Sequence, residues 1–184
     1  MDLYRAILDY QPKNEQEAHD RQQMLQFMQR HDDYLLRENT TAHFSASMWA
    51  VNPARTKVLM VYHNLYNAWA WTGGHADGME NMRDVALKEL KEETGIRSAR
   101  LVSDDIFSLE TLTVDGHMRR GQWVPSHLHF NITYLAEVDE DEALSIKADE
   151  NSGVRWWPME DVPTVCTEPW MVKHIYSKLI ANCR

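Results

Sequence analysis

The chain has 184 residues, of which 28 are acidic and 19 are lysine or arginine, so its formal net charge at pH 7 is −9. With 43% hydrophobic and 26% charged residues, the composition is that of one compact globular domain and excludes a disordered or fibrous chain. The acidic balance argues against sequence-independent binding of DNA or RNA, which needs a surface rich in lysine and arginine. We therefore expect no nucleic-acid polymer as a partner.

Neither a disulfide framework nor a membrane segment is expected. The two cysteines, Cys166 and Cys183, do not form a metal-ligand spacing. No run approaches the ~18 apolar residues that cross a bilayer, and the first ten residues contain no signal-peptide core. We expect a cytoplasmic protein without a membrane partner.

The elements follow from apolar spacing and turn residues. Residues 14–37 contain neither glycine nor proline and predict one amphipathic helix, broken near His31. Gly73 and Gly74 predict a turn before a second helix over residues 80–94, which Gly95 would end. Apolar runs bounded by turn residues predict strands over residues 44–51, 57–62, 69–71, 100–110, 127–138 and 153–157.

After an acidic loop at residues 139–142, a terminal helix is expected over residues 168–181, with four apolar residues facing inward: Trp170, Ile175, Leu179 and Ile180. Strands interleaved with few helices predict an α/β protein of the α+β type. We expect a mixed β-sheet covered by helices on both faces.

The segment from Gly74 to Ile96 carries four glutamates at fixed offsets: Glu80, Glu89, Glu92 and Glu93. At about 100° per residue, the last three share one face of the predicted helix. Like charges at i and i+4 repel, so such a stripe does not stabilise a helix. A solvated helix face is the plainer interpretation. A site for Mg²⁺ or Mn²⁺, which prefer carboxylate oxygen, is the sharper one.

This segment resembles the motif of the Nudix hydrolases, G-x5-E-x7-R-E-U-x-E-E-x-G-U, in which U is aliphatic. Every fixed position matches except Lys88, which stands where the motif has arginine; the matching residues are Gly74, Glu80, Glu89, Leu90, Glu92, Glu93, Gly95 and Ile96. The resemblance implies a Nudix-like αβα sandwich in residues 41–184, preceded by an N-terminal helical extension in residues 1–40. In that motif Gly74 and Gly95 shape the loops, and Leu90 and Ile96 anchor the helix to the sheet.

The resemblance also implies hydrolysis of a diphosphate bond in a nucleoside diphosphate linked to another group, or in a related phosphoanhydride. Glu89, Glu92 and Glu93, together with the Gly74 carbonyl, would bind the divalent Mg²⁺ or Mn²⁺. The substrate would be a small-molecule diphosphate whose linked group the sequence does not identify.

Catalytic roles would fall to Glu92, Glu89 and Lys88. Glu92 is the first candidate for the general base, because Glu89 and Glu93 lie one turn apart and are best placed to share a metal. Glu150, just before a predicted strand, is the alternative. Lysine at position 88 keeps the positive charge but lacks the planar fork of arginine, so we expect slower turnover.

Two of the nine histidines, His127 and His129, lie two residues apart on a predicted strand and so face the same side. They suit hydrogen bonding to a substrate or a second, transition-metal site. With His43 and His75, the layout is similar to that of isopentenyl-diphosphate isomerase, a Nudix-fold enzyme in which two such histidines bind a metal. Gly73 stands where that enzyme has its catalytic cysteine, so we do not expect the isomerase chemistry.

Two alternatives stand beside the hydrolase: a non-catalytic Nudix module that binds a nucleotide, and an enzyme similar to the isomerase. Retention of all four motif glutamates favours the hydrolase. The oligomeric state is open, and a homodimer is one alternative. Most of the seven tryptophans are expected in the core, with Trp123 the least core-like.

Overall fold

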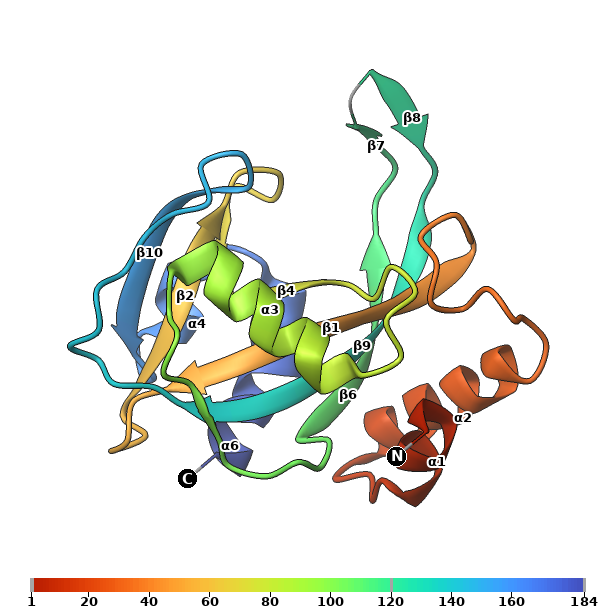
Figure 1. Ribbon diagram of the computed structural model, residues 1–184, viewed down its shortest axis with the longest axis horizontal. Helices are drawn as coiled ribbons and strands as arrows, with labels where there is room; N and C mark the ends of the chain where they lie inside the picture. Colours follow the sequence, from red (N-terminus) through yellow and green to blue (C-terminus); the bar gives the residue numbers. More distant parts are fainter. Residues whose placement is uncertain (1, 120, 184) are drawn as a thin grey trace.

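The computed structural model describes residues 2–119 and 121–183. In this part of the chain, eight strands form one sheet, and two more form a hairpin that projects from it (Figure 1). The strands are β1 Ala42–Val51, β2 Lys57–His63, β3 Ala68–Ala70, β4 Thr72–His75, β5 Arg100–Leu101, β6 Ser108–Val114, β7 His117–Arg119, β8 Gln122–Val124, β9 His127–Glu137 and β10 Asn151–Pro158.

The helical segments are α1 Leu3–Asp9, α2 Glu15–Met28, α3 Met82–Thr94, α4 Val162–Val165, α5 Pro169–Met171, the π-helix η1 Val172–Tyr176 and α6 Ser177–Asn182. No helix within residues 2–119 and 121–183 is long and apolar enough to cross a membrane.

The sheet is mixed, as predicted. Its path runs β10-β2-β1-β9-β5. β1 and β9 run parallel, and His43 lies opposite His129 in their register. β4 pairs with the first half of β1 and β2 pairs with its end, so these two strands share one edge of β1. In the same way, β5 and β6 share the outer edge of β9.

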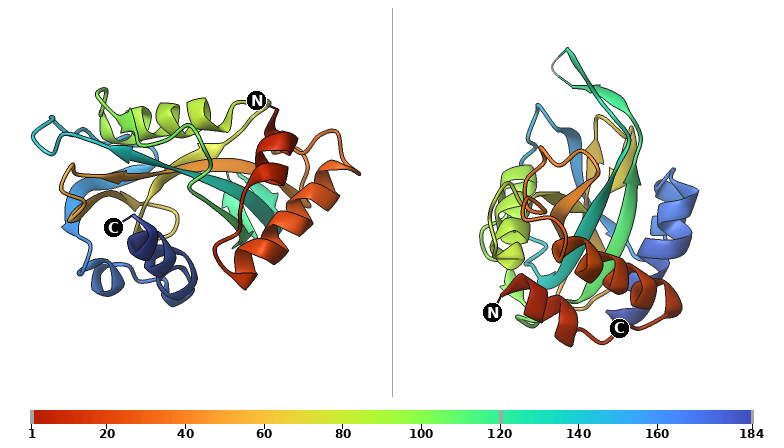
Figure 2. Two further views of the ribbon diagram at one scale, coloured as in Figure 1. Left: turned by 90° about the horizontal axis from the view of Figure 1, so that it is seen from below. Right: turned by 90° about the vertical axis from the view of Figure 1, so that its right-hand side faces the viewer.

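Strand β1 lies at the centre of the protein, and all ten of its residues are buried. Phe44, Ala46 and Met48 contribute to a core with α1, α2 and α3, whereas Trp49 and Val51 contribute to a second core with the C-terminal helices. Because both faces are covered, even the polar residues that alternate along its first half, His43, Ser45 and Ser47, are buried. Figure 2 shows α3 on one side of the sheet and the C-terminal helices on the other. The predicted αβα sandwich is confirmed.

The N-terminal segment differs from the single predicted helix. Helix α2 ends at Met28, and residues 29–38 form turns, so the predicted break near His31 is confirmed but no helix follows it. His31 stacks on Phe27 with 4.1 Å between ring centroids. The chain then brings Tyr34 and Leu35 against the core. The short α1 was not expected; the Asp2 side chain caps it by accepting from the Tyr4 backbone N–H.

Two other expectations were wrong in detail. The strand predicted over residues 100–110 is split into β5 and β6, because Ser103 and Asp105 form a local hydrogen-bonded turn between them. The turn predicted at Gly73 and Gly74 is instead strand β4, paired with β1. The glycines are needed there for close approach to neighbouring atoms, as described below.

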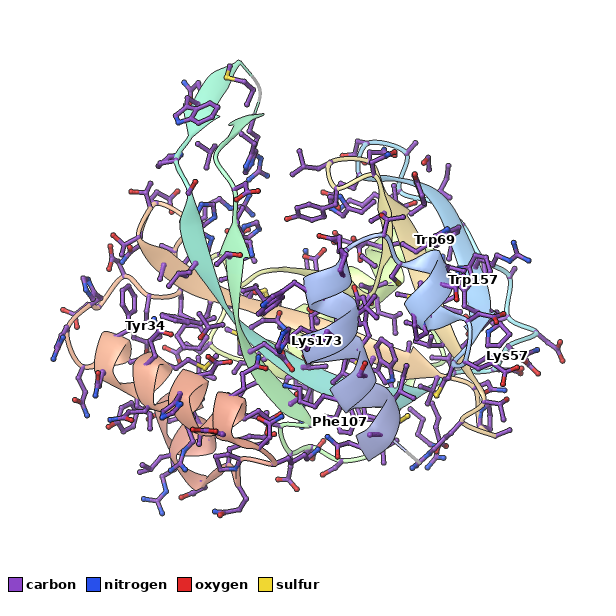
Figure 3. All side chains as sticks on the ribbon, turned by 180° about the vertical axis from the view of Figure 1, so that it is seen from behind. Tyr34, Lys57, Trp69, Phe107, Trp157 and Lys173 are labelled. Carbon is purple, nitrogen blue, oxygen red and sulfur yellow. The ribbon has the colours of Figure 1, made fainter. Side chains whose placement is uncertain are left out.

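The C-terminal segment is helical as predicted, but a π-helical turn interrupts it. Ile175 and Leu179 are fully buried, and Ile180 is partly buried. Trp170 was expected to face inward but is 46% exposed, because it stacks on His174 at the surface. Figure 3 shows this segment, which carries Lys173, lying across the sheet.

Apart from Trp170, the tryptophans lie where they were expected: Trp123 is at the surface, and the others lie in or against the core. Trp69 of β3 and Trp157 of β10, two strands that both pair with β2, pack edge to face with ring centroids 5.4 Å apart (Figure 3). Trp49 is completely buried. Trp123, on the projecting hairpin, is 65% exposed.

Buried ion pairs connect the N-terminal helix α2 to the sheet and to the C-terminal helix α6. Lys178 of α6 lies 2.9 Å from Glu17 of α2 and 3.0 Å from Glu110 of β6, and both carboxylates are fully buried. Tyr10 donates a hydrogen bond to Glu17 as well. One ammonium group therefore links a helix from each end of the chain to the sheet.

Replacing Lys178 tests this link. We expect Lys178→Met to lower the free energy of unfolding by about 3–5 kcal/mol, because two buried carboxylates lose their partner. Arg5→Met, which breaks the exposed pair with Asp9, is the control and should cost less than about 1 kcal/mol. Urea unfolding measures both variants, and equal losses would contradict the proposed role of Lys178.

Candidate functional site

A cavity of about 660 Å³ is lined by both groups of candidate residues. One group consists of the carboxylates Glu89, Glu92, Glu93 and Glu150, and the other of the imidazoles His43, His75, His127 and His129. Glu80 is exposed in the loop before α3 and is not among the lining residues.

Helix α3 holds the carboxylates in place. Leu90 and Ile96 are each 1% exposed and pack in the core, the anchoring that the family motif implies for them. Gly95 ends the helix with φ of 80°, a left-handed conformation that glycine adopts without strain. With the apolar side of the helix fixed to the sheet, Glu89 and Glu93 are buried one turn apart beside β4.

The two glycines of β4 allow that strand to approach both β1 and α3. A Cβ atom on Gly74 would lie 2.5 Å from Cδ of Glu89, and one on Gly73 would lie 2.7 Å from the carbonyl oxygen of Ala46. The backbone N–H of Gly73 donates to Oε2 of Glu93 at 3.0 Å. Any side chain at either position would separate the strand from its neighbours.

The carboxylates differ in their electrostatic surroundings. Glu93 is 2% exposed. Burial raises its pKa to about 8, and the nearby Glu89 and Glu150 act in the same direction against the hydrogen bond from Gly73. Glu92 is more open, and a hydrogen bond from Lys147 lowers its pKa. A negative charge on Glu93 is therefore unfavourable at the buried end of the cavity unless a cation lies beside it.

Two lysines bridge these carboxylates. Lys88 Nζ lies 2.9 Å from Oε1 of Glu89 and 3.2 Å from Oε1 of Glu92. Lys147 Nζ lies 3.1 Å from Glu92 and 3.0 Å from Glu150. Burial opposes the charge of Lys147, but the hydrogen bonds to Glu150 and Glu92 outweigh it and raise its pKa. Sequence reasoning missed Lys147; its spacing of three residues before Glu150 was the available signal.

The four candidate histidines come together from three strands: His43 from β1, His75 from β4, and His127 and His129 from β9. The centroid of the His43 ring lies 5.1 Å from that of His75, 4.9 Å from that of His127 and 4.8 Å from that of His129. One ligand atom each of His43, His75 and His129 lie within 4.8 Å of one another. We call these four residues the histidine cluster.

Burial drives three rings of the histidine cluster, those of His43, His75 and His129, toward their neutral form. Burial lowers the pKa of His129 to about 2 and that of His75 to about 3, and repulsion among the neighbouring rings and Arg37 adds to both effects. Burial also lowers the pKa of His43. Neutral imidazole nitrogens can accept hydrogen bonds or bind metal ions.

Ser45, Ser47 and Asn131 form a polar floor of the cavity, and they are joined by hydrogen bonds that the sequence did not indicate. Ser45 and Ser47 of β1 donate to Oδ1 of Asn131 on β9 at 3.1 and 2.9 Å. The amide of Asn131 in turn donates to Glu110 at 3.1 Å. Because Glu110 also pairs with Lys178, the floor is continuous with the buried charges that hold the N-terminal helices.

The two parts of the lining suit different ligands. Clustered carboxylate oxygens are the ligands of Mg²⁺ and Mn²⁺, whereas imidazole nitrogens suit zinc and later transition metals. The close packing of Gly74 on Glu89, and the burial of Glu93 near Glu89 and Glu150, fit a cation at the carboxylate end. His63 and His117, for which the sequence indicated no role, also line the cavity.

Comparison with known proteins gives independent information on the family of this chain. A family model described as NUDIX domain matches residues 41–183. An RNA pyrophosphohydrolase from Bartonella henselae is 29% identical over 128 residues, which cover 65% of this chain and 72% of that protein.

Two solved structures show the same fold at low sequence identity. A C. elegans Ap4A hydrolase binary complex has a TM-score of 0.52 and 19% identity, covering 76% of this chain and 93% of that chain. The E. coli dihydroneopterin triphosphate pyrophosphohydrolase has a TM-score of 0.55 and 15% identity, covering 76% of this chain and 95% of that chain.

Substitution of Gly74 tests the close approach of β4 to Glu89. We expect Gly74→Ala to weaken Mn²⁺ binding by about 10–100-fold, because the new methyl group displaces the Glu89 carboxylate from its position. Gly121→Ala is the control: its φ of 80° also disfavours a side chain, but its Cβ would have nothing within 4 Å, so backbone strain alone should leave Mn²⁺ affinity unchanged. Calorimetric titration measures both affinities. Equal Mn²⁺ affinities in the two variants would show that the position of Glu89 is not critical.

Proposed function

The chain belongs to the NUDIX domain family, and on that premise we propose that it is a divalent-metal-dependent hydrolase of diphosphate bonds. Its substrate would be a nucleoside diphosphate linked to another group, or a related phosphoanhydride. The observation that carries the proposal is the meeting of Glu89, Glu92 and Glu93 with the backbone of Gly73 and Gly74 in one cavity.

Residues 41–184 would form the catalytic domain, and residues 1–40 an N-terminal helical extension. The outermost residues of these two segments, 1 and 184, lie outside the described part of the chain.

Glu89, Glu92 and Glu93, with the Gly74 carbonyl, would hold Mg²⁺ or Mn²⁺. When bound, such ions neutralise charge on the diphosphate and polarise a water molecule for attack on phosphorus. The chain itself supplies the positions: the N–H of Gly73 orients Glu93, and Lys88 holds Glu89 at 2.9 Å.

A base must accept the proton of the attacking water. Glu92 is the first candidate because it is the most open of the three motif glutamates on α3, and its lowered pKa keeps it ionised at neutral pH. Glu150 is the alternative. Both contact Lys147, so the two candidates lie on either side of one ammonium group.

The geometry disfavours chemistry of the isomerase type. That chemistry needs a thiol at position 73, where a Cβ would lie 2.4 Å from Oγ of Ser47 and 2.7 Å from the carbonyl oxygen of Ala46. A cysteine would therefore disturb the pairing of β4 with β1. A non-catalytic nucleotide-binding module is disfavoured because all three glutamates of the site are retained in the cavity.

The linked group is best found with a substrate panel. It should contain nucleoside triphosphates, dinucleotides, nucleotide sugars and non-nucleotide diphosphates. RNA with a 5′-triphosphate belongs in the panel because the Bartonella henselae relative is named an RNA pyrophosphohydrolase. The net charge of −9 predicts that an RNA polymer binds weakly.

Glu93→Gln should abolish phosphate release from the best substrate, with a loss of at least about 100-fold in kcat, because one carboxylate ligand of the metal becomes a neutral amide. Glu80→Gln is the matched control, since Glu80 belongs to the same motif but is exposed outside the cavity. Phosphate release with Mg²⁺ or Mn²⁺ is the measurement. Unchanged turnover of Glu93→Gln would refute the assignment of the metal site.

We expect Lys88 to hold Glu89 and Glu92 in position through its positive charge. We expect Lys88→Met to lower kcat/KM by about 10–100-fold, because Glu89 and Glu92 lose the ammonium that holds them. Lys88→Arg should equal or exceed the native chain, since the planar fork can orient both carboxylates. Lys91→Met, exposed on the same helix, is the control. Equal activity of Lys88→Met and Lys91→Met would contradict this role.

A further inference from the structure

The histidine cluster contains a buried nitrogen without a partner. Nδ1 of His43 lies 2.9 Å from the backbone carbonyl oxygen of Asn39. A carbonyl oxygen only accepts hydrogen bonds, so Nδ1 of His43 carries the hydrogen and Nε2 of the neutral ring carries a lone pair. Nε2 is buried and has no hydrogen-bond partner among the described residues. Leaving such a group unpaired costs free energy.

His127 is held in the same way. Its Nδ1 lies 2.8 Å from the carbonyl oxygen of Pro125, so Nδ1 carries a hydrogen and the ring orientation is fixed. The Nε2 atom of His127 lies 3.1 Å from Nε2 of His129. Histidines that bind metals commonly donate their other ring N–H to a backbone carbonyl, which fixes the tautomer and the ring orientation. His43 shows this arrangement, and His127 beside it has the same contact.

The spacing of the nitrogens suits a metal ion. Zinc-to-nitrogen bonds of about 2.0–2.1 Å at tetrahedral angles place ligand nitrogens about 3.3 Å apart. The ligand atoms of His43, His75 and His129 lie within 4.8 Å of one another, so small ring rotations would bring them to that spacing. A hydrogen-bonded cluster without an ion would leave the lone pair of His43 unsatisfied.

We propose that His43, His75 and His129 bind one transition-metal ion of the zinc class, at a site separate from the carboxylates of α3. Three protein ligands leave a coordination position open, as catalytic zinc sites do. That position would face the cavity and accept an oxygen atom from water or from a phosphate. The proposal stands without the hydrolase assignment, because it rests on the geometry of the cluster alone.

Side-chain directions keep the two sites apart. Consecutive residues of a strand point to opposite faces, so Gly74 faces Glu89 whereas His75 faces the cluster. Carboxylate oxygen and imidazole nitrogen also select different ions. The same cavity would thus bind Mg²⁺ or Mn²⁺ at the carboxylates and an ion of the zinc class at the histidines.

The test is binding of Zn²⁺ to the full chain after chelator treatment, with excess Mg²⁺ present to occupy carboxylate sites. Calorimetry should show one equivalent of Zn²⁺ per chain. His129→Ala should weaken this binding more than 100-fold, beyond the ~10–100-fold typical of losing a supporting partner. His19→Ala, an exposed histidine on α2, should leave it unchanged. Glu93→Gln should leave it unchanged too, which separates this site from the proposed catalytic one.

A measurement on the native chain removes any dependence on the folding of the variants. With Co²⁺ in place of Zn²⁺, proton NMR should show three hyperfine-shifted imidazole N–H resonances, one from each ligand. Fewer than three would overturn the proposal. Absence of stoichiometric Zn²⁺ binding would also overturn it, as would binding that survives His129→Ala but is lost in Glu93→Gln.

Discussion

The parallel pairing of β1 with β9 is the constraint on which both parts of the cavity depend. It joins residues 42–51 to residues 128–137 in unbroken register. This register sets His43 beside His129 and Ser45 beside Asn131. Because side chains alternate along a strand, the odd-numbered residues at positions 43–47 of β1 and 129–133 of β9 then form one polar surface, while Phe44 and Phe130 pack in the core on the other face. A shift by one residue would bury the polar row and expose the core.

Strand β4 completes the arrangement at the other edge of β1. Its two glycines let the backbone lie against both Ser47 and Glu89, closer than any side chain permits. The next residue, His75, then reaches the histidine cluster. The four residues of β4 thus contact both the carboxylates of α3 and the histidine cluster of the sheet.

Burial shifts the pKa values of the two groups in opposite directions. Desolvation raises the pKa of Glu93 and lowers those of His75 and His129, so each group is driven toward its neutral form. Carboxylates in this situation are stabilised in their charged form by a cation, whereas neutral imidazoles are ready to act as ligands. The polar floor then connects the cavity through Asn131 and Glu110 to Lys178, and so to the helices at both ends of the chain.

Much of the fold could be predicted from the sequence, because it follows from local patterns. Helix α3 and its end at Gly95, the strands β1, β2 and β9, and the mixed sheet depend on apolar spacing and on turn residues near in sequence. Predictions failed where contacts between residues distant in sequence decide the local structure. Gly73 and Gly74 have the local pattern of a turn, but they form a strand that packs closely against Ser47 and Glu89. Trp170 fits an inward pattern but lies at the surface against His174.

The sequence by itself determined the family and the carboxylate residues, since the motif from Gly74 to Ile96 lies within one local segment of strand, loop and helix. Only the tertiary structure decided which groups meet those carboxylates. Lys147 reaches Glu92 across 55 residues of sequence, and Asn131 reaches Ser45 across 86. It also decided that His43, His75 and His129 form one cluster, because strand register, not spacing along the chain, brings side chains on three strands within reach of one ion.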